Sequence, residues 1–287
     1  MAVKKVSNQK DLAEAIEKVE DENMEQLSTE GPVLDEDGVV HGESFFYGYD
    51  DGEGTLHTTF SYRELNGSDE EAIGKSDVRG NIAKVYNTLA ERCIVQIGDI
   101  KKKDVGGAKW KEIIGALLIP DLDYSILKIR ELSMGKEITF RHKCPECSTK
   151  LNTVISTDDF EKVPFNGVVD IPVTFPGRGY KDGKGKLYKT GVLRRPNALD
   201  REKTMPFALK NRAQYTTMLL SRLLSFGEDV FVTPDGVKGM STRDRNYLEK
   251  LMNENNFGVD MSIGDITCSA CGADLSDVTA QSDFLSL

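Results

Sequence analysis

Histidine is scarce in this sequence, and the motifs of the common catalytic sites are lacking. Only three histidines, His41, His57 and His142, are spread over 287 residues. There is no Gly-x-Ser-x-Gly motif, no His-Glu-x-x-His motif and no pair of carboxylates placed for acid–base work. Acidic residues are numerous, but they fall on predicted polar faces, where carboxylates are solvated. We therefore expect a protein that is not an enzyme.

Long apolar runs and an excess of positive charge are also lacking. No stretch approaches the roughly 20 apolar residues of a membrane-spanning helix. Met1-Ala-Val-Lys-Lys5 leads into polar sequence, unlike the apolar core of a signal peptide. With 37 Lys and Arg against 47 Asp and Glu, the formal net charge is −10, which argues against broad binding to phosphate backbones. We expect no membrane insertion and no nucleic-acid partner.

Cysteine is used sparingly, and four of the five cysteines form two Cys-x-x-Cys pairs. This usage fits a reducing compartment and a metal rather than disulfides. A Cys-x-x-Cys turn offers two thiolates from one tight corner, and a structural Zn²⁺ takes four such ligands in tetrahedral geometry. Two pairs fill the shell and leave no position for a catalytic water. The sequence predicts one structural Zn²⁺ per chain, with four ligands: Cys144, Cys147, Cys268 and Cys271.

Other interpretations of these residues stay open from the sequence. The cysteines could be two unrelated reduced pairs or a redox dithiol. His142 lies two residues before Cys144 and could replace a thiolate as a ligand. The fifth cysteine, Cys93, lies on the apolar stripe of a predicted helix, and we expect it to be a small core residue.

An internal repeat explains the long separation of the two pairs. The same residue types follow the two cysteine pairs at the same spacing. Leu151, Val154 and Phe160 follow the first pair, and Leu275, Val278 and Phe284 follow the second. Farther upstream, Arg63-x-x-Asn-x-x-Asp69 matches Arg194-x-x-Asn-x-x-Asp200. We infer a tandem duplication. The expected fold is α+β, with two tandem copies of a strand-helix-helix-zinc-knuckle unit related by a pseudo-twofold axis through the metal.

Composition divides the chain into four parts. Residues 1–54 are acidic and rich in glycine, and we expect an extended N-terminal arm that either docks on a partner or remains a solvated tail. The two copies occupy 55–160 and 186–287. Between them, residues 161–185 are rich in proline and glycine and are expected to form a flexible linker. Its basic run, 178–186, does not match a P-loop, although phosphate binding remains the alternative.

Hydrophobic periodicity and capping residues place the elements of each copy. Helices are expected at 11–20, 78–97, 109–118, 124–132, 215–226 and 241–252, with further helix starts at Ser68 and Asp200. Strands are expected at 55–62, 187–193 and 230–232, and short strands flank each cysteine pair. A turn is expected at 234–236.

One stretch of the first copy resembles a known family. The sequence Pro120-Asp-Leu-Asp-Tyr-Ser-Ile-Leu-Lys-Ile-Arg-Glu-Leu-Ser-Met-Gly135 precedes the first cysteine-bearing strand pair. It resembles the T4-like phage baseplate hub subunit and hub-assembly family, in which a similar Pro-Asp-x-x-Tyr-x-x-x-Lys-x-Arg-x-x-Ser-x-Gly segment precedes such a strand pair. The resemblance covers residues 85–160. The second copy keeps the knuckle but lacks the Lys-x-Arg-x-x-Ser-x-Gly residues, and the arm is not covered.

The resemblance implies a structural or assembly protein of a contractile tail baseplate. Its partners would be other tail and baseplate proteins, and its location would be the virion tail, assembled in the host cytoplasm. The alternative is a nucleic-acid-binding zinc ribbon, because Arg141-His-Lys143 gives the first knuckle positive charge. Against this alternative, Asp265, Asp274 and Asp277 flank the second knuckle, and a nucleic-acid binder normally shows a basic face.

The shared metal and the pseudo-twofold axis give further expectations. Because the metal would close a long loop, replacing Cys268 with serine is expected to cost folding. Symmetry predicts a hydrophobic collar around the metal, in which Leu151 packs near Leu275 and Val154 near Val278. It also places Phe160 and Phe284 in equivalent pockets of their own copies.

Overall fold

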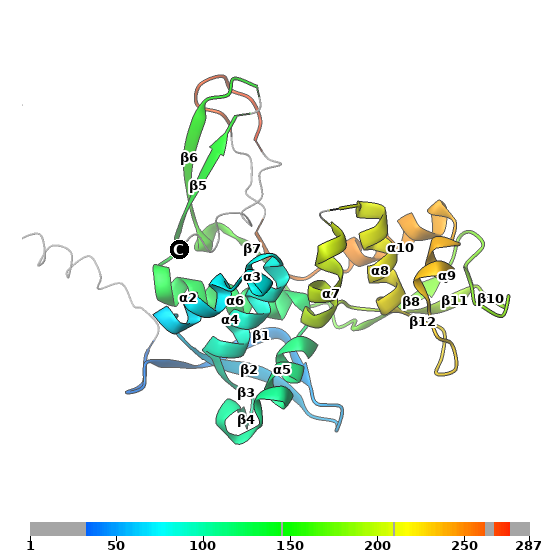
Figure 1. Cartoon of the computed structure of the whole chain (residues 1–287), viewed down its shortest axis with the longest axis horizontal. Helices are drawn as coiled ribbons and strands as arrows, with labels where there is room; N and C mark the ends of the chain where they lie inside the picture. Colours follow the sequence, from blue (N-terminus) through cyan, green and yellow to red (C-terminus); the bar gives the residue numbers. More distant parts are fainter. Residues whose placement is uncertain (1–32, 145, 209, 262–266, 276–287) are drawn as a thin grey trace, which may run out of the picture.

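The computed structural model describes residues 33–144, 146–208, 210–261 and 267–275. These residues form two lobes, each built from a small antiparallel sheet and helices, and a long hairpin that projects from the first lobe (Figure 1). The mixture of separate helices and antiparallel strands confirms the α+β class. The helix predicted at 11–20 lies outside the described residues.

The first lobe contains a four-stranded sheet in the order β1-β2-β3-β4. Its strands are β1 (Val39–Asp50), β2 (Leu56–Arg63), β3 (Ile94–Ile97) and β4 (Ile100–Lys101). Its helices are α2 (Gly67–Gly74), α3 (Ser76–Arg79), α4 (Ile82–Cys93), the 3-10 turn η1 (Lys102–Asp104), α5 (Gly107–Ala116) and α6 (Ile119–Met134). Apolar side chains from the sheet and helices form one core, which includes Phe60, Leu89, Cys93, Trp110 and Leu122.

The second lobe has its own sheet and its own core. The strand order is β12-β11-β8, and a two-stranded ladder of β9 and β10 extends the β8–β11 hairpin. The strands are β8 (Asp170–Thr174), β9 (Tyr180–Lys181), β10 (Leu187–Tyr188), β11 (Thr190–Arg194) and β12 (Leu224–Ser225). The helices are α7 (Ala198–Ala208), α8 (Arg212–Leu223), α9 (Pro234–Lys238) and α10 (Thr242–Glu254). The core includes Ile171, Tyr180, Leu220, Val237 and Leu248.

Helix α7 connects the lobes, because it packs against α8 on one side and against α4 and α5 on the other. Arg201 on α7 forms an ion pair with Asp123 on α6, with 2.6 Å between NH1 and Oδ1. Its guanidinium carbon lies 5.2 Å from the centre of the Tyr86 ring. Asn87 on α4 donates to the carbonyl oxygen of Ala198. Polar contacts therefore fix α7 against the first lobe.

A hairpin of the same construction occurs in each lobe. Tyr49-Asp-Asp-Gly-Glu-Gly-Thr-Leu56 and Tyr180-Lys-Asp-Gly-Lys-Gly-Lys-Leu187 share the pattern Tyr-x-Asp-Gly-x-Gly-x-Leu. In the turns, Oδ1 of Asp51 and of Asp182 each accepts hydrogen bonds from the backbone N–H groups two and four residues later. An aspartate that bonds its own turn in this way fixes the turn geometry.

A second aspartate in each lobe holds the segment that leads into this turn. Asp121, at the start of α6, accepts hydrogen bonds from the backbone N–H groups of residues 46–48 at 2.7, 3.2 and 2.9 Å. Asp244, near the start of α10, accepts from Gly177 and Gly179 at 2.6 and 3.0 Å. Each of these segments is therefore fixed to the last long helix of its own lobe.

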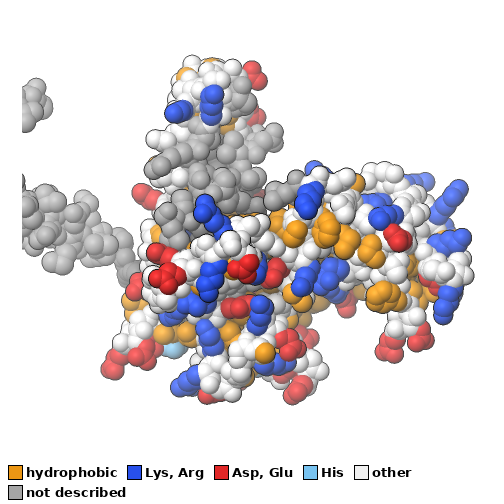
Figure 2. Space-filling model, viewed as in Figure 1, with side chains coloured by type: hydrophobic (Ala, Val, Ile, Leu, Met, Phe, Trp, Pro, Cys, Tyr) orange, Lys and Arg blue, Asp and Glu red, His pale blue; other side chains and the backbone are white. Residues whose placement is uncertain are grey.

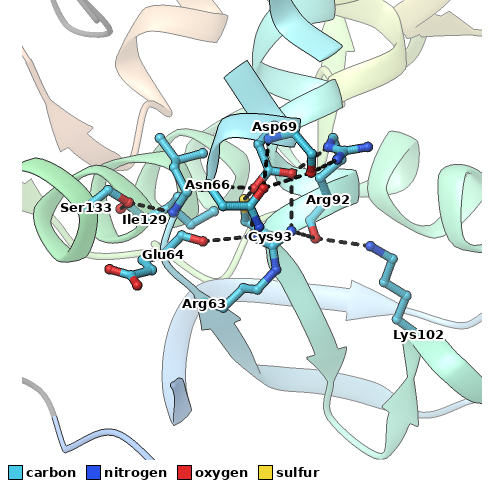
Figure 3. Close-up of polar contacts among 11 residues, drawn as sticks. Arg63, Glu64, Asn66, Asp69, Arg92, Cys93, Lys102, Ile129 and Ser133 are labelled. Carbon is cyan, nitrogen blue, oxygen red and sulfur yellow. Dashed lines mark hydrogen bonds and ion pairs between the residues drawn. The ribbon is translucent and has the colours of Figure 1, made fainter. Parts of the chain in front are cut away.

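The junction between sheet and helices in the first lobe depends on a buried carboxylate (Figure 3). Asp69 is 0% exposed. Its Oδ2 lies 2.7 Å from NH1 of Arg63, at the end of β2, and its Oδ1 lies 2.5 Å from Nε of Arg92, at the end of α4. Oδ2 also accepts from the backbone N–H of Asn66, which completes the capping box of α2.

The second lobe repeats this junction with the same atoms. Asp200 is 0% exposed. Its Oδ2 lies 2.5 Å from NH1 of Arg194, at the end of β11, and its Oδ1 lies 2.7 Å from Nε of Arg222 on α8. Asn197 and Asp200 exchange the same pair of capping bonds. The Arg-x-x-Asn-x-x-Asp match in the sequence therefore corresponds to one structural device used twice.

Several expected elements differ from the structure. The helix predicted at 78–97 is divided into α3 and α4 and ends at Cys93. Residues 94–97 continue its apolar spacing but form β3, which pairs with β2. No strand forms at 230–232, and the turn expected at 234–236 begins α9, capped by Thr233. The helices expected at 109–118, 124–132, 215–226 and 241–252 correspond to α5, α6, α8 and α10 with shifted ends.

The boundaries expected for the arm and the linker are wrong. Residues 39–50 of the expected arm form β1, and Phe45 and Tyr49 are buried in the first core. Within the expected linker, β7 (Glu161–Val163) pairs with β13 (Gly258–Asp260), and β8 and β9 belong to the second lobe. Proline and glycine misled the prediction because they occupy hairpin positions. Gly179, for example, has a φ of +82°, and a Cβ would lie 2.2 Å from a carbonyl oxygen.

Replacing Asp69 with asparagine should lower the free energy of unfolding by about 3–5 kcal/mol, because it leaves two arginines without their anion. Burial raises the pKa of Asp69, but hydrogen bonds from Arg63 and Arg92 outweigh burial and lower it from 3.8 to about 2. The folded pKa is the lower one, so this stabilisation is complete above about pH 4 and is lost towards pH 2.

Urea unfolding of the wild type and D69N between pH 2 and pH 7 measures this effect. The difference between the two proteins should shrink as the pH falls through that window. The matched control is D158N, which removes an exposed carboxylate paired with Lys136 and should leave the free energy of unfolding nearly unchanged. Equal stability of D69N and the wild type at pH 7 would contradict the structural role of Asp69.

Candidate metal centre

A seven-pair antiparallel hairpin carries the first cysteine pair away from the lobes. It consists of β5 (Glu137–Lys143) and β6 (Lys150–Ser156), in register from Glu137 opposite Ser156 to Lys143 opposite Lys150. In Figure 1 it rises from the first lobe, and residues 267–275 lie at its tip. The tip therefore brings Cys144 close to Cys271, which is 127 positions later in the sequence.

The four paired cysteines lie together at this tip. Their Sγ atoms all lie within 4.8 Å of one another. The Sγ–Sγ distance is 3.7 Å both for Cys144 with Cys271 and for Cys147 with Cys268. Four sulfurs at 2.3 Å from one tetrahedral ion would be separated by about 3.8 Å. The spacing is thus compatible with four thiolates on one metal ion such as zinc.

Both knuckles close with the same backbone bonds. The first cysteine of each pair, Cys144 or Cys268, donates its N–H to the carbonyl oxygen five residues later, at 2.9 and 2.8 Å. Its own carbonyl oxygen accepts from the N–H four residues later, at 3.0 and 2.8 Å. That later residue has positive φ in both knuckles, +62° at Ser148 and +73° at Gly272. Two separate segments therefore present their sulfurs with the same local geometry.

A small apolar cluster packs against the two cysteine knuckles. Cys144 and Cys268 are buried together with Leu275, and Leu151 packs against them. Leu151 and Leu275 thus lie in one cluster, as the predicted collar requires. Val154 does not belong to the cluster: its side chain is 56% exposed, because it lies on the free outer face of a two-stranded hairpin. The collar prediction is wrong for Val154.

The other residues considered from the sequence lie elsewhere or outside the described part. Phe160 is buried in the first core. Val278, Phe284 and the side chain of His142 lie outside the described residues. Cys93 is a buried residue of the first core, as expected, with Sγ 3.8 Å from Asp69 Oδ2. In the described ranges, the four-cysteine cluster is the one group of His, Cys, Asp and Glu side chains with metal-binding spacing.

The copies predicted at 55–160 and 186–287 begin too late to include the whole of the paired hairpins. Tyr49 and Tyr180 are separated by the same number of residues as Arg63 and Arg194. Extending that gap-free alignment upstream would have found the hairpin pattern. The second arginine of each buried cluster has a weaker signal. Asn81, Ala83, Leu89 and Arg92 match Asn211, Ala213, Leu219 and Arg222 in spacing, but this alignment is shifted by one residue from that of Arg63 and Arg194, and only the folded chain brings Arg92 to Asp69.

Comparison with known proteins gives one family match. Residues 53–182 match the family described as T4 bacteriophage base plate protein, which is less than half of the chain. The matched part begins just before β2 and includes the β5–β6 hairpin with Cys144 and Cys147. It also contains the segment 120–135 that carries the resemblance in the sequence. No curated protein and no solved structure gives a significant match. In the described part of the chain, no helix is long and apolar enough to span a bilayer.

Replacing Leu275 with alanine should loosen the knuckles without unfolding the lobes. Leu275 is 3% exposed and belongs to a cluster separate from both large cores. Removal of a buried leucine side chain costs about 2–5 kcal/mol, and a value near 2 is expected for so small a cluster. Amide hydrogen exchange at Cys268 should accelerate accordingly. The control is V154A, which changes an exposed side chain of the β5–β6 hairpin. Equal acceleration of amide exchange at Cys268 in both variants would contradict the assignment of Leu275 to the cysteine cluster.

Proposed function

We propose that the chain is a structural or assembly component of the baseplate of a contractile phage tail, of the hub type. The observation that carries this proposal is the family match over residues 53–182. The family is one of baseplate proteins, which favours a non-enzymatic role, a location in the virion tail and partners among other tail proteins. A net charge of −10 disfavours the alternative of a nucleic-acid-binding zinc ribbon.

We also propose that Cys144, Cys147, Cys268 and Cys271 hold one structural Zn²⁺. Support comes from the two sulfur–sulfur distances of 3.7 Å and from the repeated knuckle backbone. Four thiolates complete a tetrahedral shell, so the ion would act as a cross-link without an open coordination position. It would join the first lobe's hairpin to the segment that follows the second lobe.

The third part of the proposal is that the two lobes arose by tandem duplication. It is supported by recurring contacts: the turn aspartates, the helix aspartates that hold the segment before each turn, and the buried Arg–Asp–Arg clusters. In the repeat, Cys144 corresponds to Cys268 and Cys147 corresponds to Cys271. The contact between Cys144 and Cys271 therefore corresponds to the contact between Cys268 and Cys147, and the Sγ–Sγ distance is 3.7 Å in both. A pseudo-twofold axis at the metal would have this property. Each copy would then begin upstream of residue 55 or 186, at its first hairpin strand.

Metal analysis of purified protein should find one zinc per chain, and C268S should lose it. Both large cores lie outside the cysteine cluster, so C268S should keep the far-ultraviolet circular dichroism of the wild type. It should nevertheless unfold more easily, because a cross-link between residues 127 apart is lost. Chain entropy puts such a constraint on the order of 4–5 kcal/mol. C93A should retain zinc. Wild-type protein without zinc, or unchanged melting of C268S, would contradict the cross-link.

A nonsense mutation in the gene for this chain, in the phage that encodes it, tests the baseplate role. Electron microscopy of the resulting lysate should show that complete contractile tails with baseplates are absent, and supplying the chain from a plasmid should restore them. Mass spectrometry of purified wild-type particles then separates two roles. A chain present in particles is structural, and one absent from them acts only in assembly. Normal tails from the mutant would refute the proposal.

A further inference from the structure

The two equivalent hairpins carry opposite charges at their ends. The acidic tip consists of Asp50, Asp51 and Glu53, between β1 and β2. The basic tip consists of Lys181, Lys184 and Lys186, between β9 and β10, and includes one aspartate, Asp182. Exposed Arg178 and Lys189 flank the basic tip, and the far edge of the second lobe is rich in Lys and Arg in Figure 2.

The positions that form the hairpin are the same in both lobes, whereas the exposed positions differ. Asp51 and Asp182 make the same turn bonds, and the glycines of Asp-Gly-x-Gly are retained. The residue before the turn aspartate is Asp50 in one tip and Lys181 in the other, and the residue two after it is Glu53 or Lys184. These four side chains are exposed. Asp50 also accepts a hydrogen bond from the backbone N–H of Gly52 at 2.9 Å, but the matching turn forms with Lys181 at that position. The turn therefore does not require an acidic side chain there, and the opposite signs need another explanation.

Each tip also exposes a leucine at the same position. Leu56 is 44% exposed and Leu187 is 49% exposed, and each is the first residue of the strand that leaves the turn. Both hairpins extend away from the helices of their lobes (Figure 1). Each tip therefore presents a small apolar contact bordered by a net charge of one sign, and the two signs are complementary.

We propose that copies of this chain associate head to tail through these tips. The acidic tip of one copy contacts the basic tip of the next, with Leu56 of one against Leu187 of the other. Charges of opposite sign steer the encounter and select this pairing over contacts between like tips. Because the two contacting surfaces differ, the contact is heterologous, and its repetition gives a closed ring or an open chain of copies.

A second copy fits both tips, whereas a nucleic acid fits only one. A phosphate backbone would match the basic tip, but it would be repelled by the acidic tip and by the net charge of −10. A second copy of the chain carries a basic tip for the acidic tip of the first copy and an acidic tip for its basic tip. The complementarity is internal to the sequence, so it does not depend on the proposed zinc or on the baseplate role.

Charge reversal at matched positions tests the proposal with the full-length chain. One variant, K181E/K184E, has two acidic tips, and the other, D50K/E53K, has two basic tips. Asp51, Asp182 and Lys186 are left in place, because the aspartates form the turns and Lys186 packs on the Tyr188 ring. Sedimentation velocity in about 20 mM salt should show association of the wild type. Either variant alone should associate at least tenfold more weakly.

An equimolar mixture of the two variants should associate again, because each supplies the sign that the other lacks. Association of the wild type should also weaken steeply with salt, since about 1 M salt shortens the screening length to roughly 3 Å. The control K75E/K103E makes the same change in net charge as K181E/K184E, at exposed sites outside the tips, and should associate like the wild type. A monomeric wild type at all concentrations, or failure of the mixture to associate, would overturn the proposal. A different result would favour a nucleic-acid partner instead: a wild type that does not self-associate but binds a DNA oligonucleotide in a salt-dependent way, with that binding lost in K181E/K184E.

Discussion

A carboxylate buried between two arginines determines how each lobe is built. Asp69 and Asp200 have lost all contact with water, and a buried carboxylate is tolerated only when its charge and its lone pairs are satisfied. The guanidinium groups come from the end of a strand and from a later helix, while the aspartate belongs to the first helix. Satisfying one charge therefore brings three elements into a fixed arrangement. The hairpins and the cysteine-bearing segments extend from that arrangement.

The sequence was informative where chemistry is encoded over short distances. The Cys-x-x-Cys pairs predict a shared cluster, and the pattern Arg-x-x-Asn-x-x-Asp recurs in both halves of the sequence. The sequence was not informative where tertiary contacts determine the secondary structure or the partner of a residue. Ile94 to Ile97 continue the apolar spacing of α4, yet pairing with β2 makes them a strand. Arg92 lies 23 residues from Asp69, so no local pattern identifies it as the second partner. Proline and glycine between residues 161 and 185 indicated a linker, but Pro172 lies within a strand and Gly179 meets a positive-φ requirement.

The cysteine cluster lies apart from the two cores, so it and the cores are stabilised in different ways. The cores depend on apolar burial within each lobe, with α7 as the connection between them. The cysteine cluster has few apolar neighbours and sits at the end of a two-stranded hairpin, an element with little stability of its own. Such a tip needs a stronger constraint than packing supplies, and four converging thiols are suited to provide one.

The meeting of two distant segments of the chain at the cysteines has a mechanical consequence. Cys147 and Cys268 meet at the hairpin tip, and the whole second lobe lies between them in the sequence. With a metal ion joining the cysteines, tension applied to the two ends of the chain would pass through the first lobe and the metal–sulfur bonds. The second lobe, enclosed in the loop, would carry none of that load until the cross-link opened. A chain cross-linked in this way would yield in two stages under load, first at the thiolates and only then in the enclosed lobe.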